Sequence, residues 1–302
     1  MNDRKPTKRR VLVRGLSTLF YETGEGPVVL LVPGVASDPQ DWFPVMDELA
    51  LTHRVIALSL PGLSGTSPWP DVRPAATASF VADFLDVLGV DSVIAVGHSF
   101  GGLVAAELAL QNPQVVGRLA LVDASGLGRA VHPVAIALAL LPERAADLVS
   151  ALASLPGGGA ALTLSSNLLL HQPWRIPART WAAQLRMARS REALRTVLKV
   201  FRECGGVTGQ RESTTVVDRL HEIDVPTLVV WGGFDQLLPL WQGWAAARRL
   251  PDGRFTVLVG AGHVSYLDSH EEFMDALGPF VRDDLELTSR TRGVDTGGGG
   301  HP

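Results

Sequence analysis

Short apolar runs alternate with longer amphipathic segments along most of this chain. Runs rich in valine, isoleucine and leucine predict eight β-strands, at residues 11–13, 18–22, 28–32, 55–60, 92–96, 119–122, 227–231 and 255–259. Apolar residues at helical spacing predict helices at residues 41–51, 75–88, 100–111, 240–250 and 271–284. This alternation is typical of a mostly parallel sheet with helices on both faces, begun here by an antiparallel hairpin of the first two strands. The pattern predicts the α/β fold class.

The alternation is interrupted once, by about a hundred residues between the strands at 119–122 and 227–231. Triple glycine at 157–159 and Pro173 break this segment, whose predicted helices lie at residues 134–141, 145–155, 162–170, 178–189 and 191–203. A helical segment between two strands of one sheet is expected to form a lid over that sheet and not a separate domain.

These elements divide the chain into one domain and its appendages. The predicted core comprises residues 11–124 and 216–286, and the helical lid comprises residues 125–215, inserted after the sixth strand. Residues 1–10 are polar and basic, and we expect them to form a flexible N-terminus. The glycine-rich residues 287–302 are expected to form a disordered tail.

Composition and charge narrow the function classes. Hydrophobic residues make up 46% of the 302 residues and charged residues 19%, as in globular proteins, and the net charge of −4 does not favour nucleic-acid binding. Cys204 is the only cysteine, so no intrachain disulfide can form. No apolar signal sequence follows the basic start, and no run reaches the roughly 18 apolar residues of a membrane span. We expect a cytoplasmic protein without a membrane span, and the oligomeric state stays open.

The strongest chemical signal is the segment GHSFG at residues 97–101, which matches the pattern G-x-S-x-G. It lies directly after a predicted strand and directly before a predicted helix. A serine on such a sharp turn needs small neighbours two positions away, which Gly97 and Gly101 supply. The turn lifts the Ser99 hydroxyl above the carboxyl edge of the sheet, where open α/β sheets bind ligands. Ser99 is therefore the candidate nucleophile.

A serine hydroxyl needs a base, and histidine suits that role near neutral pH. His263 follows the last predicted strand and a glycine-containing turn, which places it at the same sheet edge as the nucleophile. The orienting carboxylate should also follow a strand: Asp235 is the preferred candidate and Asp123 its competitor, since the order Ser, Asp, His fits either. The strand-to-helix turn that carries Ser99 is called the nucleophile elbow. His98 is expected to be a packed or hydrogen-bonding neighbour of this elbow, and Asp268 a cap of the last helix.

Acyl transfer also needs N–H donors where negative charge develops on the carbonyl oxygen. The backbone N–H of Phe100, the residue after the nucleophile, is one candidate for this oxyanion hole. The second should come from the loop after the third strand, where the N–H of Val35 is the first choice and that of Ala36 the second. Gly34 lets the backbone of this loop approach a substrate closely.

With these residues in place, the chain resembles the α/β-hydrolase superfamily, and within it the lidded serine-esterase branch. The resemblance covers nearly the whole chain, from about residue 10 to residue 284, through the segments PGVAS with DW, LPGLSGTS, GHSFGG, WGGFDQLLP and GAGHVSYLD in family order. It implies the α/β-hydrolase fold with the triad Ser99, Asp235 and His263.

Relatives often carry a histidine where this chain has Pro33 and an aspartate where it has Ser59. The serine at the elbow argues against haloalkane dehalogenase or epoxide hydrolase chemistry, which uses a carboxylate nucleophile.

The residues and the resemblance together imply a serine hydrolase that cleaves a carboxylic ester, or a related acyl compound, through an acyl-enzyme. Neither a metal nor an organic cofactor is expected. The lid is rich in leucine, alanine and valine, so the small-molecule substrate is expected to carry an apolar group. Nine lysines and arginines between residues 172 and 211 form either a solvated helix face or an attraction for an anionic substrate or an acidic carrier protein.

Other functions are compatible with the same residues. Carbon–carbon bond hydrolases of the meta-cleavage type, lactonases and cofactor-free perhydrolases use such a triad. A ligand-binding receptor of the same fold is a further class, which robust multiple turnover would exclude.

Overall fold

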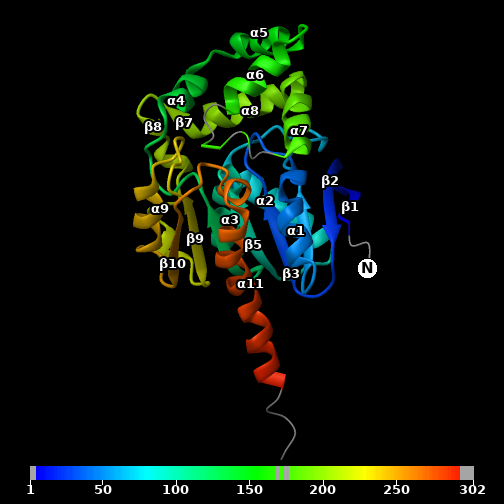
Figure 1. The fold of residues 1–302 in the computed structure, drawn as a ribbon, viewed down its shortest axis with the longest axis vertical. Coiled ribbons are helices and arrows are strands. Elements are labelled where there is room, and N and C mark those ends of the chain that lie inside the picture. Colours follow the sequence, from blue (N-terminus) through cyan, green and yellow to red (C-terminus); the bar gives the residue numbers. More distant parts are fainter. Residues whose placement is uncertain (1–4, 168–170, 173, 175–176, 293–302) are drawn as a thin grey trace, which may run out of the picture.

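The computed structural model of the protein describes residues 5–167, 171, 172, 174 and 177–292. Its main sheet has eight strands in the order β1-β2-β4-β3-β5-β6-β9-β10 (Figure 1). β2 is antiparallel to both β1 and β4, whereas all other neighbours in this sheet are parallel. The strands are β1 (Thr7–Val13), β2 (Leu16–Thr23), β3 (Val28–Val32), β4 (Arg54–Leu58), β5 (Val93–His98), β6 (Val116–Val122), β9 (Thr227–Gly232) and β10 (Gly253–Leu258).

Helices cover both faces of this sheet, so the predicted α/β class and the mostly parallel eight-stranded sheet are confirmed. One face is covered by α2 (Pro74–Val87), α3 (Phe100–Gln111) and α9 (Leu240–Ala247). The other face is covered by α1 (Phe43–Leu49), α10 (Ser265–Asp268) and α11 (His270–Arg292). Short 3-10 turns lie at Pro39–Trp42, Glu212–Thr214 and Leu220–Glu222.

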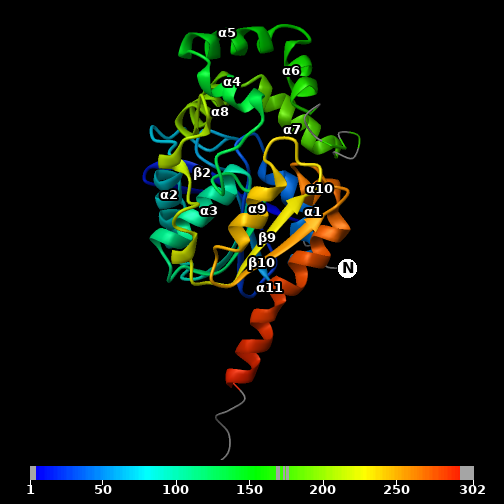
Figure 2. The same cartoon turned by 90° about the vertical axis from the view of Figure 1, so that its left-hand side faces the viewer.

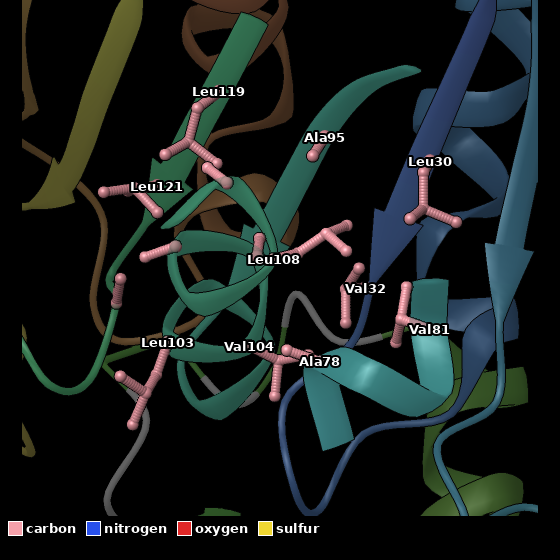
Figure 3. Close-up of a cluster of buried hydrophobic side chains, with 14 of the residues drawn as sticks. Leu30, Val32, Ala78, Val81, Ala95, Leu103, Val104, Leu108, Leu119 and Leu121 are labelled. Atoms are coloured by element: carbon pink, nitrogen blue, oxygen red, sulfur yellow. The ribbon is translucent and has the colours of Figure 1, made fainter. Parts of the chain in front are cut away.

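Alternate residues of each central strand enter different cores. In β3, Leu30 and Val32 pack toward α2 and α3, whereas Val29 and Leu31 pack toward α1 and α11. Figure 3 shows the first of these cores, where Leu30 and Val32 lie among side chains of β5, β6, α2 and α3. Because both faces are buried, the central strands are continuous apolar runs in the sequence.

In the described part of the chain, five α-helices separate β6 from β9, and Figures 1 and 2 show them beyond the carboxyl ends of the parallel strands. We call residues 125–215 the insertion. Its two ends lie side by side, because the N–H of Val216 donates to the carbonyl of Gly126 (3.0 Å) and the N–H of Gln210 donates to that of Arg129 (2.8 Å). Its elements are α4 (Pro133–Leu140), α5 (Glu143–Ser154), α6 (Gly158–Asn167), α7 (Ala178–Ala188), α8 (Arg191–Cys204), β7 (Gly205–Gly206) and β8 (Gly209–Gln210).

The predicted boundary at the N-terminal side is wrong. Residues 7–10 belong to β1 and not to a flexible segment, because they pair with residues 19–22 of β2. The guanidinium of Arg9 also lies 2.9 Å from the carboxylate of Glu22 on that strand. The basic composition of residues 7–10 therefore led to the wrong prediction, because these residues extend an edge strand that pairs with the strand directly after it.

The C-terminal boundary is also wrong, since α11 continues to Arg292, past the predicted start of a disordered tail at residue 287. Residues 293–302 lie outside the described residues. Within the insertion, α6 begins at Gly158, inside the triple glycine that was expected to break the helices, and residues 168–170 of the helix predicted at 162–170 lie outside the described part.

Among the described residues, no single helix is long and apolar enough to cross a membrane. One bent pair in the insertion, Asp147–Ser154 with Gly158–Leu164, meets the length and composition criteria only when its two helices are taken together across a bend of 112°.

The two-sided packing of β3 makes a first prediction. Leu30→Ala should lower the free energy of unfolding by about 2–5 kcal/mol, because it leaves a cavity between β3 and its covering helices where the leucine is 0% exposed. Leu51→Ala is the matched control, since Leu51 is 70% exposed and should change that free energy by less than about 0.5 kcal/mol. Urea denaturation measures both, and equal effects would contradict the assignment of β3 to the core.

Candidate active site

Ser99 lies on the sharp turn between β5 and α3. Its backbone angles, φ 52° and ψ −120°, are rare for a residue with a side chain and cost on the order of 1–3 kcal/mol. The turn is held by the N–H of Ser99, which donates to the carbonyl of Val122 (3.0 Å), and by the N–H of Ser125, which donates to the carbonyl of Ser99 (3.0 Å). The strained residue is thus fixed from both neighbouring segments at the carboxyl edge of the sheet.

The glycines of the G-x-S-x-G pattern are required by close backbone contacts. A Cβ atom on Gly97 would lie 2.3 Å from the carbonyl oxygen of Gly101. A Cβ atom on Gly101 would lie 2.3 Å from the carbonyl oxygen of Val32 at the end of β3. The absence of side chains at both positions lets α3 approach the sheet and begin directly at the serine.

The structure brings Ser99, His263 and Asp235 together from three strand ends. His263 follows β10, and its Nε2 atom lies 3.0 Å from the hydroxyl oxygen of Ser99. Its Nδ1 atom lies 2.8 Å from Oδ2 of Asp235, which follows β9. The other carboxylate oxygen of Asp235 accepts hydrogen bonds from the N–H groups of Leu237 (2.8 Å) and Leu238 (2.9 Å), which fix its orientation.

Opposing effects act on the His263 imidazole, whose side chain is 8% exposed. Burial lowers the pKa of His263, but the carboxylate of Asp235, its hydrogen bond and the further carboxylates of Asp123 and Asp268 raise it, and the net pKa lies above the ordinary 6.5. This arrangement stabilises the protonated imidazole that would form if His263 accepted the serine proton.

Asp123, the competing carboxylate, binds backbone N–H groups, whereas Asp235 is the carboxylate hydrogen-bonded to the His263 ring. Its side chain accepts hydrogen bonds from the backbone N–H of Gly232 (2.7 Å) and of Ser265 (3.2 Å), and so joins the loops that carry Asp235 and His263. It is fully buried, and burial together with the nearby Asp235 raises the pKa of its carboxyl to about 8. Its φ of 44° marks a second strained backbone at the site.

Two further residues brace His263. The ring of His98 donates from Nε2 to the carbonyl oxygen of His263 (2.7 Å), and burial together with His263 lowers the pKa of His98 to about 3, so this ring stays neutral. His98 is thus the hydrogen-bonding neighbour that the sequence suggested. Asp268, predicted as a cap of the last helix, ends the short helix α10 two residues before α11 and accepts the N–H of Gly262 (2.8 Å). The sequence contained no signal for these backbone acceptors and donors beyond their closeness to strand ends.

The loop after β3 lies against the elbow. A Cβ atom on Gly34 would lie 2.9 Å from Nδ1 of His98 and 3.2 Å from Cβ of Ser99. The N–H groups of Val35 and Phe100, predicted from the sequence as oxyanion donors, flank this contact, and neither has a hydrogen-bond acceptor among the described residues. Neither N–H group is therefore used within the described part of the chain.

The middle of the insertion, between α6 and α7, contacts the loops of the triad through His171 and Gln172. His171 stacks on Phe234, the neighbour of Asp235, with ring centroids 4.3 Å apart and an interplanar angle of 10°. The side chain of Gln172 donates to the carbonyl of Gly260 (2.5 Å), three residues before His263. Within the described part of the chain, no group of three or more His, Cys, Asp or Glu side chains could hold a metal ion.

The chain belongs to the α/β hydrolase fold family, whose model matches residues 27–270. It is 29% identical over 292 residues to an uncharacterised protein of Mycobacterium tuberculosis, covering 91% of this chain and 81% of that protein. It is 28% identical over 279 residues to a 2-hydroxy-6-oxo-6-phenylhexa-2,4-dienoate hydrolase of Comamonas testosteroni, covering 87% and 90%. A thermophilic esterase from Thermogutta terrifontis has a similar structure, with a TM-score of 0.74 and 24% identity over 92% of this chain and 98% of the esterase. The fold, and membership of a family that includes hydrolases, are thereby established.

The contact between Gly101 and β3 can be tested directly. Gly101→Ala should lower the free energy of unfolding by about 1–3 kcal/mol, because the new methyl group meets the carbonyl of Val32. Alanine would otherwise be favoured inside a helix. Gly117→Ala is the control, since its nearest neighbour would lie 3.5 Å away. Thermal or denaturant unfolding measures both variants, and a stabilised Gly101→Ala variant would contradict the close approach of α3.

Proposed function

We propose that this protein is a serine hydrolase that cleaves a carboxylic ester, or a related acyl compound, of a small apolar molecule. The observation that carries the proposal is the continuous chain of short contacts from the Ser99 hydroxyl through His263 to Asp235, at 3.0 and 2.8 Å. Nucleophile, base and orienting carboxylate in this order are the parts that acyl transfer needs.

The proposed reaction has two stages. His263 accepts the Ser99 proton while the serine oxygen attacks the substrate carbonyl, and the protonated imidazole then gives that proton to the leaving alcohol. Water attacks the acyl-enzyme in the second stage, with His263 again as base, and the acid is released. Asp235 keeps the imidazole in the tautomer that carries hydrogen on Nδ1 and stabilises its protonated form.

The oxyanion would be stabilised by the backbone N–H groups of Phe100 and Val35. Their closeness to the serine and their lack of an acceptor among the described residues support this role. Loss of one such donor typically costs about 3–4 kcal/mol of transition-state stabilisation.

We further propose that the insertion acts as a lid. It lies beyond the carboxyl edge that holds the triad, and His171 and Gln172 contact the loops of Asp235 and His263. Residues of α8 also reach the core, since Thr196 lies against Gly62. A covering of this kind excludes water and selects the substrate by shape.

Carbon–carbon bond hydrolysis is the second candidate function, because the Comamonas testosteroni relative carries the name of such a hydrolase. The same three side chains would then act on a vinylogous 1,5-diketone. Parallel assays with such a diketone, with short nitrophenyl esters and lactones, and with acetate plus hydrogen peroxide separate the two candidates and the perhydrolase alternative by their relative kcat/KM values.

The nucleophile can be identified by covalent labelling. A fluorophosphonate should modify Ser99, as mapped by mass spectrometry of the peptide, and Ser99→Ala should abolish the label and lower ester turnover at least about 10⁴-fold. Ser92→Ala, a serine before the same strand, should leave both unchanged. Labelling at another serine would disprove the proposed nucleophile, and a single slow turnover with tight retention of the ligand would favour the receptor alternative.

The pH profile tests the roles of His263 and Asp235. For a neutral ester, kcat/KM should fall as the pH is lowered through the raised pKa of His263, with a midpoint above 6.5, because the protonated ring cannot accept the serine proton. Asp235→Asn removes the main group that raises this pKa while burial persists. The midpoint should therefore move to lower pH, and the maximal rate should fall about 10⁴-fold. An unchanged midpoint in this variant would contradict the assignment of Asp235.

A further inference from the structure

The outer face of the insertion carries a row of exposed leucines that no part of the described chain covers. Leu148, Leu152 and Leu155 are 60%, 53% and 57% exposed, and Leu164 on α6 is 56% exposed. The first three are spaced four and three residues apart, so they lie on one face of α5 and its end. We call these four residues the apolar ridge.

The opposite side of α5 is already packed, and the ridge has no partner among residues 5–167, 171, 172, 174 and 177–292. Ala153 is 3% exposed and Ser150 is 1% exposed. Asp147, in the same helix, is paired with the guanidinium of Arg195 on α8. The helix is therefore docked through its other face, and the leucines point away from the molecule.

The apolar ridge forms a projecting corner. α5 and α6 meet at an angle of 112°, and Figures 1 and 2 both show α5 on the side of the insertion that faces away from the sheet. Leu155 and Pro156 lie at this bend and are exposed. A corner of this shape can enter a soft surface without a complementary groove.

The insertion as a whole is positively charged, although α5 itself carries Glu143 and Asp147 beside Arg144. The insertion contains eleven lysines and arginines and five acidic residues, a net charge of +6, whereas the rest of the chain carries −10. Arg144 is exposed in the first turn of α5, Arg191 approaches Asp147 (4.0 Å), and Arg189 lies against Gly159 at the start of α6. Arg144 therefore stands at the start of α5 and Arg189 beside the start of α6, while Arg191 faces Asp147.

We propose that the apolar ridge docks this protein on an anionic lipid surface. The leucines would enter the boundary between headgroups and acyl chains, while the arginines of the insertion pair with lipid phosphates. The charge asymmetry sets the orientation, because the acidic core is repelled by such a surface and the insertion is attracted to it. This surface lies on the same side of the molecule as the triad, so the inference goes beyond ester hydrolysis to the place where the protein works.

A second copy of the chain fits the ridge less well. A two-fold contact uses the same patch on both subunits, and it would bring two insertions of charge +6 against each other. A bilayer that contains anionic lipid supplies the opposite charge and accepts a convex apolar corner.

Vesicle sedimentation with the full chain tests the proposal. The protein should bind vesicles of phosphatidylcholine with about 30% phosphatidylglycerol at least tenfold more tightly than vesicles of phosphatidylcholine alone, and added salt should weaken binding. The double variant Leu152→Ser with Leu155→Ser should bind at least tenfold more weakly. The matched control, Leu12→Ser with Leu51→Ser, replaces leucines that are 67% and 70% exposed on the core and should bind within about twofold of the wild type.

Single charge changes refine the test. Arg144→Gln should weaken binding to the anionic vesicles about fivefold, whereas Arg254→Gln, at the start of β10, should leave it unchanged. Hydrolysis of a short water-soluble ester should stay unchanged in all these variants. If the wild type binds vesicles but hydrolyses no ester, this result would contradict the proposed function and leave the docking proposal standing.

Three results would overturn the docking proposal. These are no binding to anionic vesicles, equal binding by the ridge variant and its control, or a dimer in sedimentation velocity that the ridge variant abolishes. The last result would assign the ridge to a second copy of the chain.

Discussion

The whole site depends on how closely α3 approaches the sheet at the turn that holds Ser99. Gly97 and Gly101 leave space for backbone contacts that any side chain would block. Because the helix starts at the strand end, its first N–H groups point to the place where the serine hydroxyl lies. The strained backbone of Ser99 persists because its N–H donates to Val122 of β6 and its carbonyl accepts the N–H of Ser125, so the turn is held on both sides.

Around this fixed serine, the other groups of the site are held mainly through their backbone. Asp123 joins the segments after β9 and β10 through hydrogen bonds. His98 donates to the carbonyl of His263, and Asp268 accepts the N–H of Gly262, the residue before His263. The imidazole can therefore keep its short distances to Ser99 while burial and neighbouring carboxylates act on its pKa in opposite directions. The buried side chains of Asp123, His98 and Asp268 therefore fix the position of the loops that carry the triad.

The strands, the elbow and the meeting of Ser99, His263 and Asp235 could be predicted because each leaves a local pattern, an apolar run or a residue directly after one. The sequence favours Asp235 over Asp123, but Asp123 stays a competitor because both follow strands. In the fold, Asp235 contacts the ring of His263 and Asp123 accepts backbone N–H groups. β1 was underestimated because its pairing with β2 outweighs its basic composition. The roles of His98 and Asp268 depend on contacts across more than one loop, which no sequence spacing encodes.

The hydrogen bonds between the two ends of the insertion have a consequence for how this protein can diversify. A hydrogen bond joins Gly126 and Val216, at the two ends of the insertion, and β6 pairs directly with β9. The sheet therefore does not depend on the length or sequence of the insertion. The insertion can therefore be replaced as a unit. Its exchange between relatives would change the substrate specificity and leave the sheet and its active-site loops unchanged, and natural variation is expected to accumulate there faster than in the strands.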